Sequence, residues 1–429
     1  MNLLEAPAAA APGIPVPAAP AARFVGDTGD YLALLTRGAV LLALTLGIYR
    51  FWFATDLRRF LWSNTEVAGE TLEYTGTPFE LLIGFLIAMA LLVPIYVGFF
   101  VVALNLGPFG QFASVLGFPL LAFLGHFAVY RARRYRLTRT VYRGIRCHQD
   151  GSAWRYAVCA LFWWVLIILT LGLAYPFAQS RLERFKMRHT YYGDLNGRFY
   201  GSGFRLLLRG LPMWLLAVGP LAAALVYSVA TVEWDKVAAA AARTKNGAEF
   251  INQLESSFPN VYAAIVVAIT AFSVSVAMAA VLFPVFQAMM LRWWLSGLRF
   301  GTLTIRSHLR TAQIYGAYLR FLLYGLLFLV VAALFGGLVI GLGVAAAKPY
   351  MQRETFEAVA AFSGVIFYVI MMLGFSTIYQ ATVKLSLWRC GVESAELEGL
   401  AILDQVKAEG TPSSALGEGL ADALNVGGF

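Results

Sequence analysis

Two apolar runs of the sequence carry the same interruption near their ends. Residues 31–49 read YLALLTRGAVLLALTLGIY, and residues 156–178 read YAVCALFWWVLIILTLGLAYPFA. Each run contains Thr-Leu-Gly, at residues 45–47 and 170–172. Glycine weakens a helix, and proline follows the second motif. We therefore expect helices to break at Gly47, Gly172 and Pro176.

Six further apolar runs are long enough to cross a bilayer, which takes about 20 residues. They contain no Asp, Glu, Lys or Arg, and they are Leu81–Leu104, Phe112–Tyr130, Gly210–Val232, Val261–Leu291, Phe321–Ala347 and Ala358–Val383. Hydrophobic residues make up 59% of the chain and charged residues 13%, whereas a soluble domain carries about 25% charged residues. The composition excludes a soluble fold, a disordered chain and a disulfide scaffold. It predicts an all-α polytopic membrane protein.

Two topologies are open, and the distribution of arginine separates them. Arginine-rich segments follow Tyr130, Ala178 and Leu291. If all eight runs cross the membrane, the first of these segments lies opposite the other two. If the two Thr-Leu-Gly runs are re-entrant or interfacial helices, all three segments and both termini share the cytoplasmic side, as the positive-inside rule favours. We therefore expect six full transmembrane helices plus two re-entrant or interfacial helices, with eight plain spans as the alternative.

An internal repeat relates the two interrupted runs. An offset of 125 residues, without gaps, aligns Tyr31 with Tyr156 and Thr45 with Thr170. We expect copies over about residues 24–82 and 149–207, with partial copies near residues 130–146, 284–306 and 379–393. These lie in a single membrane domain, residues 23–400. A disordered Ala/Pro-rich tail precedes it over residues 1–22, and an acidic flexible C-terminal tail follows over residues 401–429, after a short helix around Ala395–Lys407.

The repeated unit combines four parts. A polar segment with glycine comes first, and the Thr-Leu-Gly run follows it. A basic amphipathic helix comes next, Tyr49–Trp62 in the first copy. The unit ends in a short cytoplasmic β-like segment, Thr71–Gly76 in the first copy and Gly197–Gly201 in the second.

Arginine and tryptophan gather where this unit is expected to meet the headgroup layer. The interfacial aromatics are Trp52, Trp62 and Trp293, and the candidate contacts of an anionic lipid or solute are Arg37, Arg59, Arg184 and Arg292. One interpretation is an ordinary aromatic and cationic belt. The other is an anion pocket formed across repeats by Arg59, Arg184 and Arg292. Arg37 lies within the first interrupted run, where it either snorkels to the interface or lines a polar cavity.

Familiar catalytic and metal motifs are missing from the sequence. It has no phosphate loop, HExxH, CxxC or GxSxG motif, and its three cysteines and four histidines are scattered. Because no catalytic constellation is present, we expect no enzyme activity, no cofactor and no metal. No span holds a pair of carboxylates, which weakens the case for a proton-coupled transporter. The net charge of +9 sits at the ends of apolar runs, which suits anionic lipid headgroups of a phospholipid bilayer and not nucleic acid. The spacing Gly337-x-x-x-Gly341 predicts close helix packing, either within the chain or in a homo-oligomer.

The glycine, aromatic and polar residues around the first Thr-Leu-Gly motif are similar to those of a known family. The matching residues are Phe24-x-Gly26, Tyr31, Leu44-Thr-Leu-Gly-Ile-Tyr49, Trp52, Arg59, Leu61-Trp-Ser-Asn-Thr65, Gly69 and Glu73-Tyr-Thr-Gly-Thr77. They resemble the YjgN-type family of bacterial inner-membrane proteins, a domain of unknown function, over about Phe24–Leu82. The resemblance implies a place in the bacterial plasma (inner) membrane, and it brings no activity or functional residues. The Ala/Pro-rich start and the acidic tail lie outside the family pattern.

Two functions are compatible with these features. The first is a transporter or channel for a small, perhaps anionic, solute, because broken helices are tolerated in a membrane only when buried in protein or lining a cavity. The second is a non-catalytic membrane scaffold that binds lipids or partner proteins at the cytoplasmic leaflet. A lipid-modifying enzyme is a third function, which no nucleophile or metal constellation supports.

Overall fold

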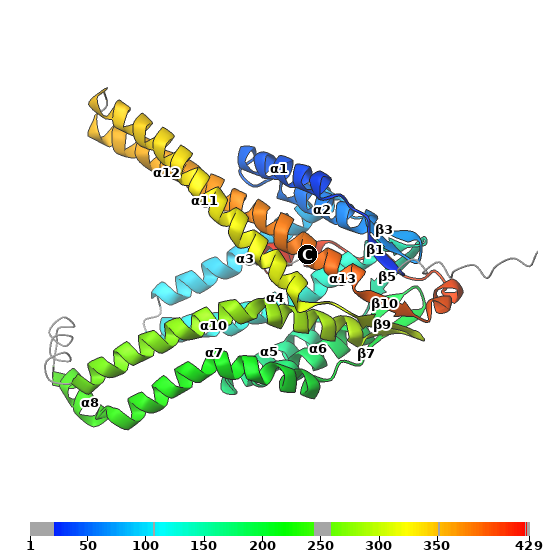
Figure 1. The fold of residues 1–429 in the computed structure, drawn as a ribbon, viewed down its shortest axis with the longest axis horizontal. Coiled ribbons are helices and arrows are strands. Elements are labelled where there is room, and N and C mark those ends of the chain that lie inside the picture. The colour runs from blue at the N-terminus through cyan, green and yellow to red at the C-terminus, as the bar shows by residue number, and fades with distance from the viewer. Residues whose placement is uncertain (1–20, 106–107, 244–258, 351, 425, 427–429) are drawn as a thin grey trace, which may run out of the picture.

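The computed structural model describes residues 21–105, 108–243, 259–350, 352–424 and 426 (Figure 1). Apart from residues 21 and 22, the expected Ala/Pro-rich tail lies outside the described residues. The helices are α1 (Thr28–Leu44), α2 (Arg50–Ser63), α3 (Pro78–Asn105), α4 (Pro108–Thr138), α5 (Ala153–Leu169), α6 (Tyr175–Arg188), α7 (Gly203–Thr231), α8 (Trp234–Arg243), α10 (Pro259–Gly297), α11 (Thr311–Ala347), α12 (Arg353–Tyr379), α13 (Leu385–Glu393) and α14 (Leu416–Ala423). Short 3-10 helices are η1 (Lys348–Tyr350) and η3 (Leu400–Gln405), and η2 (Gln380–Lys384) is a π-helix between α12 and α13.

Ten short strands form one antiparallel sheet, whose order along the sheet is the order along the chain. The strands are β1 (Ala22–Phe24), β2 (Thr65–Val67), β3 (Glu70–Tyr74), β4 (Thr140–Tyr142), β5 (Ile145–Gln149), β6 (Thr190–Tyr192), β7 (Leu195–Phe199), β8 (Leu298–Phe300), β9 (Leu303–Ser307) and β10 (Ala395–Glu398). The predicted β-like segments correspond to β3 and β7. The sheet is more extensive than the expected isolated segments, because every strand finds a partner far along the chain.

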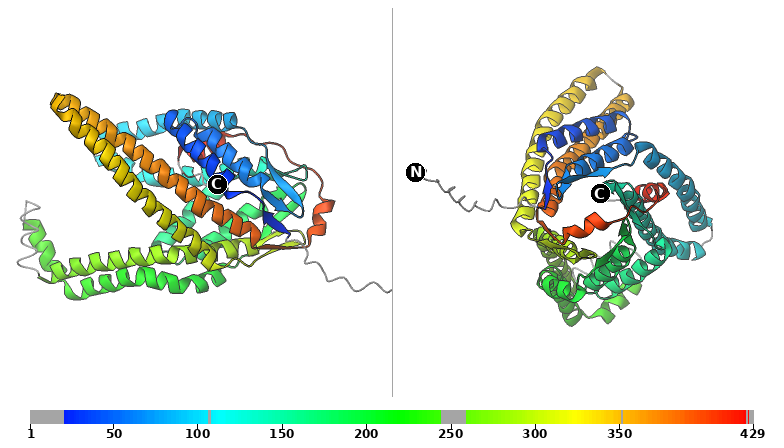
Figure 2. Two further views of the ribbon diagram at one scale, coloured as in Figure 1. Left: turned by 45° about the horizontal axis from the view of Figure 1, so that its top comes forward. Right: turned by 90° about the vertical axis from the view of Figure 1, so that its right-hand side faces the viewer.

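Five helical hairpins leave this sheet and return to it at paired strands. The short hairpins α1/α2 and α5/α6 connect β1 to β2 and β5 to β6. The long hairpins α3/α4, α7/α10 and α11/α12 connect β3 to β4, β7 to β8 and β9 to β10. Strands β1 and β10 lie close together, and the end-on view in Figure 2 shows the hairpins arranged around a ring. Both ends of each hairpin therefore lie at the same end of the molecule.

The described residues include five helices that are long and apolar enough to cross a membrane. They are Pro78–Val102, Gly203–Thr231, Pro259–Gly297, Thr311–Tyr350 and Arg353–Glu393, and each overlaps a predicted span. The sixth predicted span, Phe112–Tyr130, lies within α4. The 17-residue helix α5 is apolar but shorter than a span. The protein is thus a helical membrane protein.

The predicted helix breaks at the two Thr-Leu-Gly motifs are present. Leu46 and Gly47 adopt left-handed φ values of 50° and 90°, and Leu171 and Gly172 adopt 49° and 94°. A left-handed residue ends a helix and reverses the chain, and glycine adopts this conformation without strain. The threonine hydroxyl spans the turn: Oγ1 of Thr45 donates to the Leu41 carbonyl at 2.7 Å and accepts from the Tyr49 amide at 3.0 Å. Pro176 then lies in the first turn of α6, where its missing N–H costs no hydrogen bond.

Most of the buried core lies at the bases of the hairpins, next to the sheet, and a smaller cluster of Val232, Val261 and Ala264 lies at the far end of the α7/α10 hairpin. Tyr31 and Leu35 of α1 pack against Leu57 and Leu61 of α2 and against α13. Large apolar side chains farther along the long hairpins are exposed, as at Phe335, which is 70% exposed. Extended apolar surface of this kind is the surface that lipid covers in a membrane protein.

The C-terminal region differs from the expected flexible tail. The expected short helix around Ala395–Lys407 is instead strand β10 followed by η3. Leu403 of η3 is buried against Tyr142, Tyr192 and Leu303, and α14 packs between α3 and α4. A Cβ on Gly419 of α14 would lie 1.9 Å from the Gly84 backbone of α3, so only glycine permits this approach. Small residues and glycines suggest a tail in the sequence, and here they serve close packing.

Candidate functional site

Four arginines near the ends of helices fasten the hairpin bases in the same way. Each donates from its guanidinium to the carbonyl of a glycine that follows a strand, and the pairs are Arg59–Gly76, Arg134–Gly151, Arg184–Gly201 and Arg389–Gly26. The first three pairs are 17 residues apart. The bond is 3.0 Å long at Arg59 and 3.3 Å at Arg184. Two of the predicted anion contacts thus hold backbone carbonyls where a strand gives way to the next helix.

The other two predicted arginines have different surroundings. Nη2 of Arg292 donates to Oγ1 of Thr311 at 3.1 Å, and its Nε donates to the Ala288 carbonyl at 3.3 Å. Arg37 is exposed on α1. The central cavity described below is lined by other residues than these two.

The predicted interfacial tryptophans connect elements at the bases of the hairpins. Nε1 of Trp62 donates to Oγ1 of Thr140 at 3.0 Å, and Nε1 of Trp293 donates to the Ser202 carbonyl at 3.2 Å. The Trp52 ring meets Phe79 edge-on, with 5.5 Å between centroids. The Trp62 and Trp52 contacts link α2 to the next hairpin. The Trp293 contact links the two ends of the α7/α10 hairpin, so these rings help hold the hairpin bases together.

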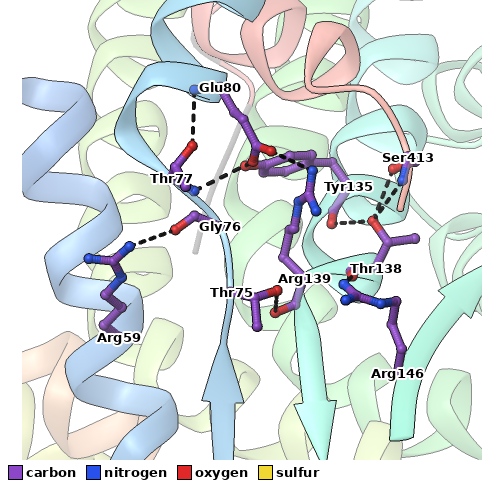
Figure 3. A network of polar contacts seen from close by, with 10 residues as sticks. All are labelled: Arg59, Thr75, Gly76, Thr77, Glu80, Tyr135, Thr138, Arg139, Arg146 and Ser413. Atoms are coloured by element: carbon purple, nitrogen blue, oxygen red, sulfur yellow. Dashed lines mark hydrogen bonds and ion pairs between the residues drawn. The ribbon is translucent and has the colours of Figure 1, made fainter. Parts of the chain in front are cut away.

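A polar network joins the base of the α3/α4 hairpin to the C-terminal segment (Figure 3). Glu80, in the first turn of α3, accepts hydrogen bonds from Tyr135 Oη at 2.7 Å and Arg139 Nη2 at 2.6 Å. One turn along α4, the hydroxyls of Thr138 and Ser413 lie 3.0 Å apart. The network therefore places the chain just before α14 against α4.

A buried ion cluster fixes α14 itself. Glu418 forms an ion pair with Arg58, and both side chains are at most 7% exposed. The Nε of Arg136 lies 3.7 Å from the other Glu418 oxygen. Burial opposes the charge on Arg58, but Glu418 and Tyr74 outweigh it and raise the pKa of the guanidinium above its ordinary value. At the exposed end of α14, Asp422 forms an ion pair with Arg50.

A central cavity of about 490 Å³ lies between the hairpin bases. Its lining comes from α1, α2, α6, α10, η2 and α13, and its polar members are Tyr31, Tyr175, Gln179, Glu183, Gln287 and Lys384. Three indoles, Trp293, Trp294 and Trp388, complete much of the wall. Cavities of this size with a few convergent polar groups are typical ligand sites.

Some polar groups of the central cavity have hydrogen-bond or ion-pair partners within the protein, and the hydroxyl of Tyr31 has none that the described structure shows. Glu183 forms an ion pair with Lys186 through Oε1 and accepts from Trp294 Nε1 at 3.1 Å through Oε2. Gln287 accepts from Tyr318 Oη at 2.9 Å. The hydroxyl of Tyr31 is buried without a hydrogen-bond partner in the described structure. A buried unpaired hydroxyl is costly. Tyr31 is 0% exposed, so a ligand in the cavity reaches this hydroxyl only after a neighbouring side chain of the wall moves.

Lys384 reaches the cavity from a π-helical segment. Helix α12 passes through η2 into α13, and Lys384 is the last residue of η2. Single π-turns within long α-helices occur frequently at functional sites. The amides in the cavity wall are those of Gln179 and Gln287. The cavity wall thus combines an ammonium, hydroxyls and amides with aromatic rings. No group of three His, Cys, Asp or Glu that could hold a metal occurs in the described ranges.

Sequence reasoning named one residue of this cavity, Trp293, as an interfacial aromatic, and it missed the polar residues of the wall. Glu183 lies one position before the aligned Arg184, and its burial depends on α10, which supplies Trp294. Lys384 lies just after an uncharged span and resembles a snorkelling lysine. A weak signal was present, because Gln179 and Gln287 are the glutamines of two similar stretches, Pro-Phe-Ala-Gln and Pro-Val-Phe-Gln.

The comparison with protein families matches residues 19–423 to a family described as bacterial protein of unknown function (DUF898). This match confirms the resemblance to the YjgN-type family. It also extends through the acidic C-terminal region to α14, which the sequence alone places outside the family pattern. Comparisons with curated proteins and with solved structures gave no match. Because the match covers nearly all of the sequence, the chain belongs to the bacterial family of unknown function DUF898.

Proposed function

We propose that this protein is a multi-pass protein of the bacterial inner membrane that carries a small, polar or anionic solute through its central cavity, as a transporter or channel. In this proposal the five hairpins are copies of one unit that surround a shared site. Such an arrangement is common in membrane transporters. The observation that carries the proposal is the central cavity, with Lys384 and the unpaired Tyr31 hydroxyl in its wall.

The proposed membrane orientation follows from the hairpin bases. The arginine-rich ends of the helices lie at the sheet, and the positive-inside rule places them in the cytoplasm with both termini. The long hairpins then cross and return. Helices α1 and α5 have 17 residues each, or roughly 25 Å at about 1.5 Å per residue. The short hairpins, whose ends both lie at the sheet, are therefore proposed to be re-entrant.

Cysteine labelling tests whether the cavity is a pathway. The native cysteines Cys147, Cys159 and Cys390 are replaced, and Gln287→Cys is introduced in the cavity wall. A membrane-impermeant anionic methanethiosulfonate is then applied to right-side-out and to inverted vesicles. A transporter or channel opens its site to each side, so we expect labelling of Gln287→Cys in both preparations.

Two matched variants control this experiment. Leu338→Cys lies on an exposed apolar position of α11, where lipid excludes the reagent, and we expect no labelling from either side. Arg198→Cys lies at an exposed position of the sheet, and we expect labelling only in inverted vesicles. If Gln287→Cys reacts from a single side or from neither, the pathway proposal is refuted.

A second function, lipid binding at the cytoplasmic leaflet, is favoured by one surface feature. Trp154 is 61% exposed at the start of α5, next to Arg155. An indole beside a guanidinium suits the headgroup layer. If this is the function, Arg155→Glu should reduce the phosphatidylglycerol that copurifies with the protein, as measured by native mass spectrometry. Unchanged lipid content would exclude it.

A further inference from the structure

An apolar pocket lies on the side of the molecule next to the central cavity. This lateral pocket has a volume of about 430 Å³ and lies between the Thr-Leu-Gly turn of the α5/α6 hairpin and helices α7 and α10. Its wall includes Gly172, Leu207, Gly210, Trp214 and Phe283. Nε1 of Trp214 donates to the Leu171 carbonyl at 2.8 Å, so the turn is fastened to α7 beside the pocket. The pocket is lined almost wholly by apolar side chains.

The lateral pocket and the central cavity are neighbours. Tyr175, Phe286 and Met290 line both, so these three side chains form the partition between them. The rings of Tyr175 and Phe286 lie 5.9 Å apart, centroid to centroid. Methionine is unbranched and flexible, which suits a partition that adapts to a ligand. An apolar compartment thus adjoins a polar one across a thin layer of side chains.

The charge at the polar end favours an anion. Both carboxylate oxygens of Glu183 are already engaged, by Lys186 and by Trp294. Lys384 contributes an ammonium to the cavity wall. The unpaired Tyr31 hydroxyl supplies a neutral donor. Donors of these kinds form strong hydrogen bonds with carboxylate or phosphate oxygens.

We propose that the two compartments form one site for an anionic amphiphile with a single apolar chain. The chain occupies the lateral pocket, and a carboxylate or phosphate head reaches the central cavity near Lys384 and Tyr31. This inference rests on the proposed function and specifies its substrate class. It also explains the position of the pocket at the Thr-Leu-Gly turn, because a re-entrant turn lies at the depth of lipid chains.

Binding of cis-parinaric acid, a fluorescent fatty acid, tests the site in protein reconstituted in nanodiscs. Gly210→Trp fills the lateral pocket; a Cβ at this position meets only the tip of Met289, at 3.6 Å, so the variant should fold. Lys384→Met removes the cation. We expect each to weaken binding by about tenfold or more. Leu338→Trp, on the exposed face of α11, adds the same indole elsewhere and should leave the affinity unchanged.

Competition identifies the head and separates this inference from the proposed function. A lysophosphatidic acid that displaces the probe better than oleate assigns the site to phosphate heads, and the reverse assigns it to carboxylates; both support the proposal. Equal binding to wild type and Gly210→Trp overturns it, as does displacement by inorganic phosphate alone, which indicates a solute without a chain. In that case labelling of Gln287→Cys from both sides still supports the pathway, so the two failures are distinguishable.

Discussion

Removing the charge of Glu418 gives the sharpest test of how α14 is held. In Glu418→Gln the side chain keeps its size but no longer neutralises Arg58, whose side chain is 7% exposed. Arg136, 3.7 Å from the second oxygen and 17% exposed, loses its counter-charge at the same time. Breaking a buried ion pair from one side costs about 3–5 kcal/mol, because the remaining charge stays buried. We take the lower end, about 3 kcal/mol, since glutamine still accepts a hydrogen bond.

Thermal unfolding in detergent, followed by tryptophan fluorescence, measures this loss. At about 2 °C per kcal/mol for a large domain, we expect the Tm to fall by roughly 6 °C. Asp422→Asn is the matched control on the same helix. Its pair with Arg50 is about 40% exposed on both sides, and exposed pairs contribute about 0–1 kcal/mol. We expect that variant to unfold within about 2 °C of wild type.

Limited trypsin digestion separates local release of α14 from global destabilisation. Lys407 precedes α14, and its backbone amide donates to Asp194 at 3.0 Å. Release of α14 in Glu418→Gln should speed cleavage after Lys407, and it should do so below the unfolding temperature. If Glu418→Gln and Asp422→Asn match wild type in both Tm and cleavage rate, the buried cluster does not hold α14 and our reasoning is wrong.

Two further predictions follow from particular residues. Burial raises the pKa of the Cys147 thiol to about 12 from 9.0, so the reactive thiolate forms only as the pH approaches about 12; at about pH 8 its fraction is roughly 10⁻⁴, compared with roughly a tenth for an unperturbed thiol. Iodoacetamide should therefore modify Cys147 far more slowly in folded than in denatured protein, as mass spectrometry measures, and equal rates would contradict the burial. Gly172→Ala forces alanine to a φ of 94° and should cost about 1–2 kcal/mol, whereas Gly98→Ala inside α3, with open space around its Cβ position, should be neutral or stabilising. A Tm for Gly172→Ala equal to that of Gly98→Ala would refute the assigned turn.

The parts of the fold that the sequence predicts are those set by local chemistry. The chain reverses at each Thr-Leu-Gly motif through residues with positive φ. Glycine adopts this conformation without strain, so a glycine at the end of an apolar run indicates the turn. The long spans can be predicted from uncharged runs, because each residue that faces lipid must itself be apolar. Both signals can be recognised without knowing which segments meet in space.

The sheet and the central cavity depend on pairings that no local pattern reveals. Strand β4 has three residues, Thr140–Tyr142, which is too few for a periodic signal, and its register is set by β3 beyond the α3/α4 hairpin. Glu418 resembles a solvated carboxylate in an acidic tail, and its partner Arg58 lies 360 residues away. The positions of the arginines could be predicted from the sequence, but their roles could not. A cation near the end of a helix suits lipid headgroups, an anionic ligand or a backbone carbonyl equally well.

The central cavity needs contact between the first strand with α1 and the segment η2–α13, because both parts supply residues of its wall. We call this contact the junction. Arg389, in α13, donates to the Gly26 carbonyl next to the first strand at 2.8 Å. Tyr31 and Lys384, which both line the cavity, come from opposite sides of this junction. A ligand that contacts both therefore binds only the closed ring and stabilises it by RT ln(1 + [L]/Kd).

The same linkage makes a prediction about a residue outside the cavity wall. Arg389→Gln weakens the junction and should lower the affinity for whatever ligand the cavity holds, cis-parinaric acid included, although Arg389 does not line the cavity. Arg59→Gln breaks the equivalent bond to Gly76 within a single stretch of chain, where closure does not depend on it, and should affect affinity less. Equal affinities for the two variants would mean that the ring stays closed without the Arg389 bond.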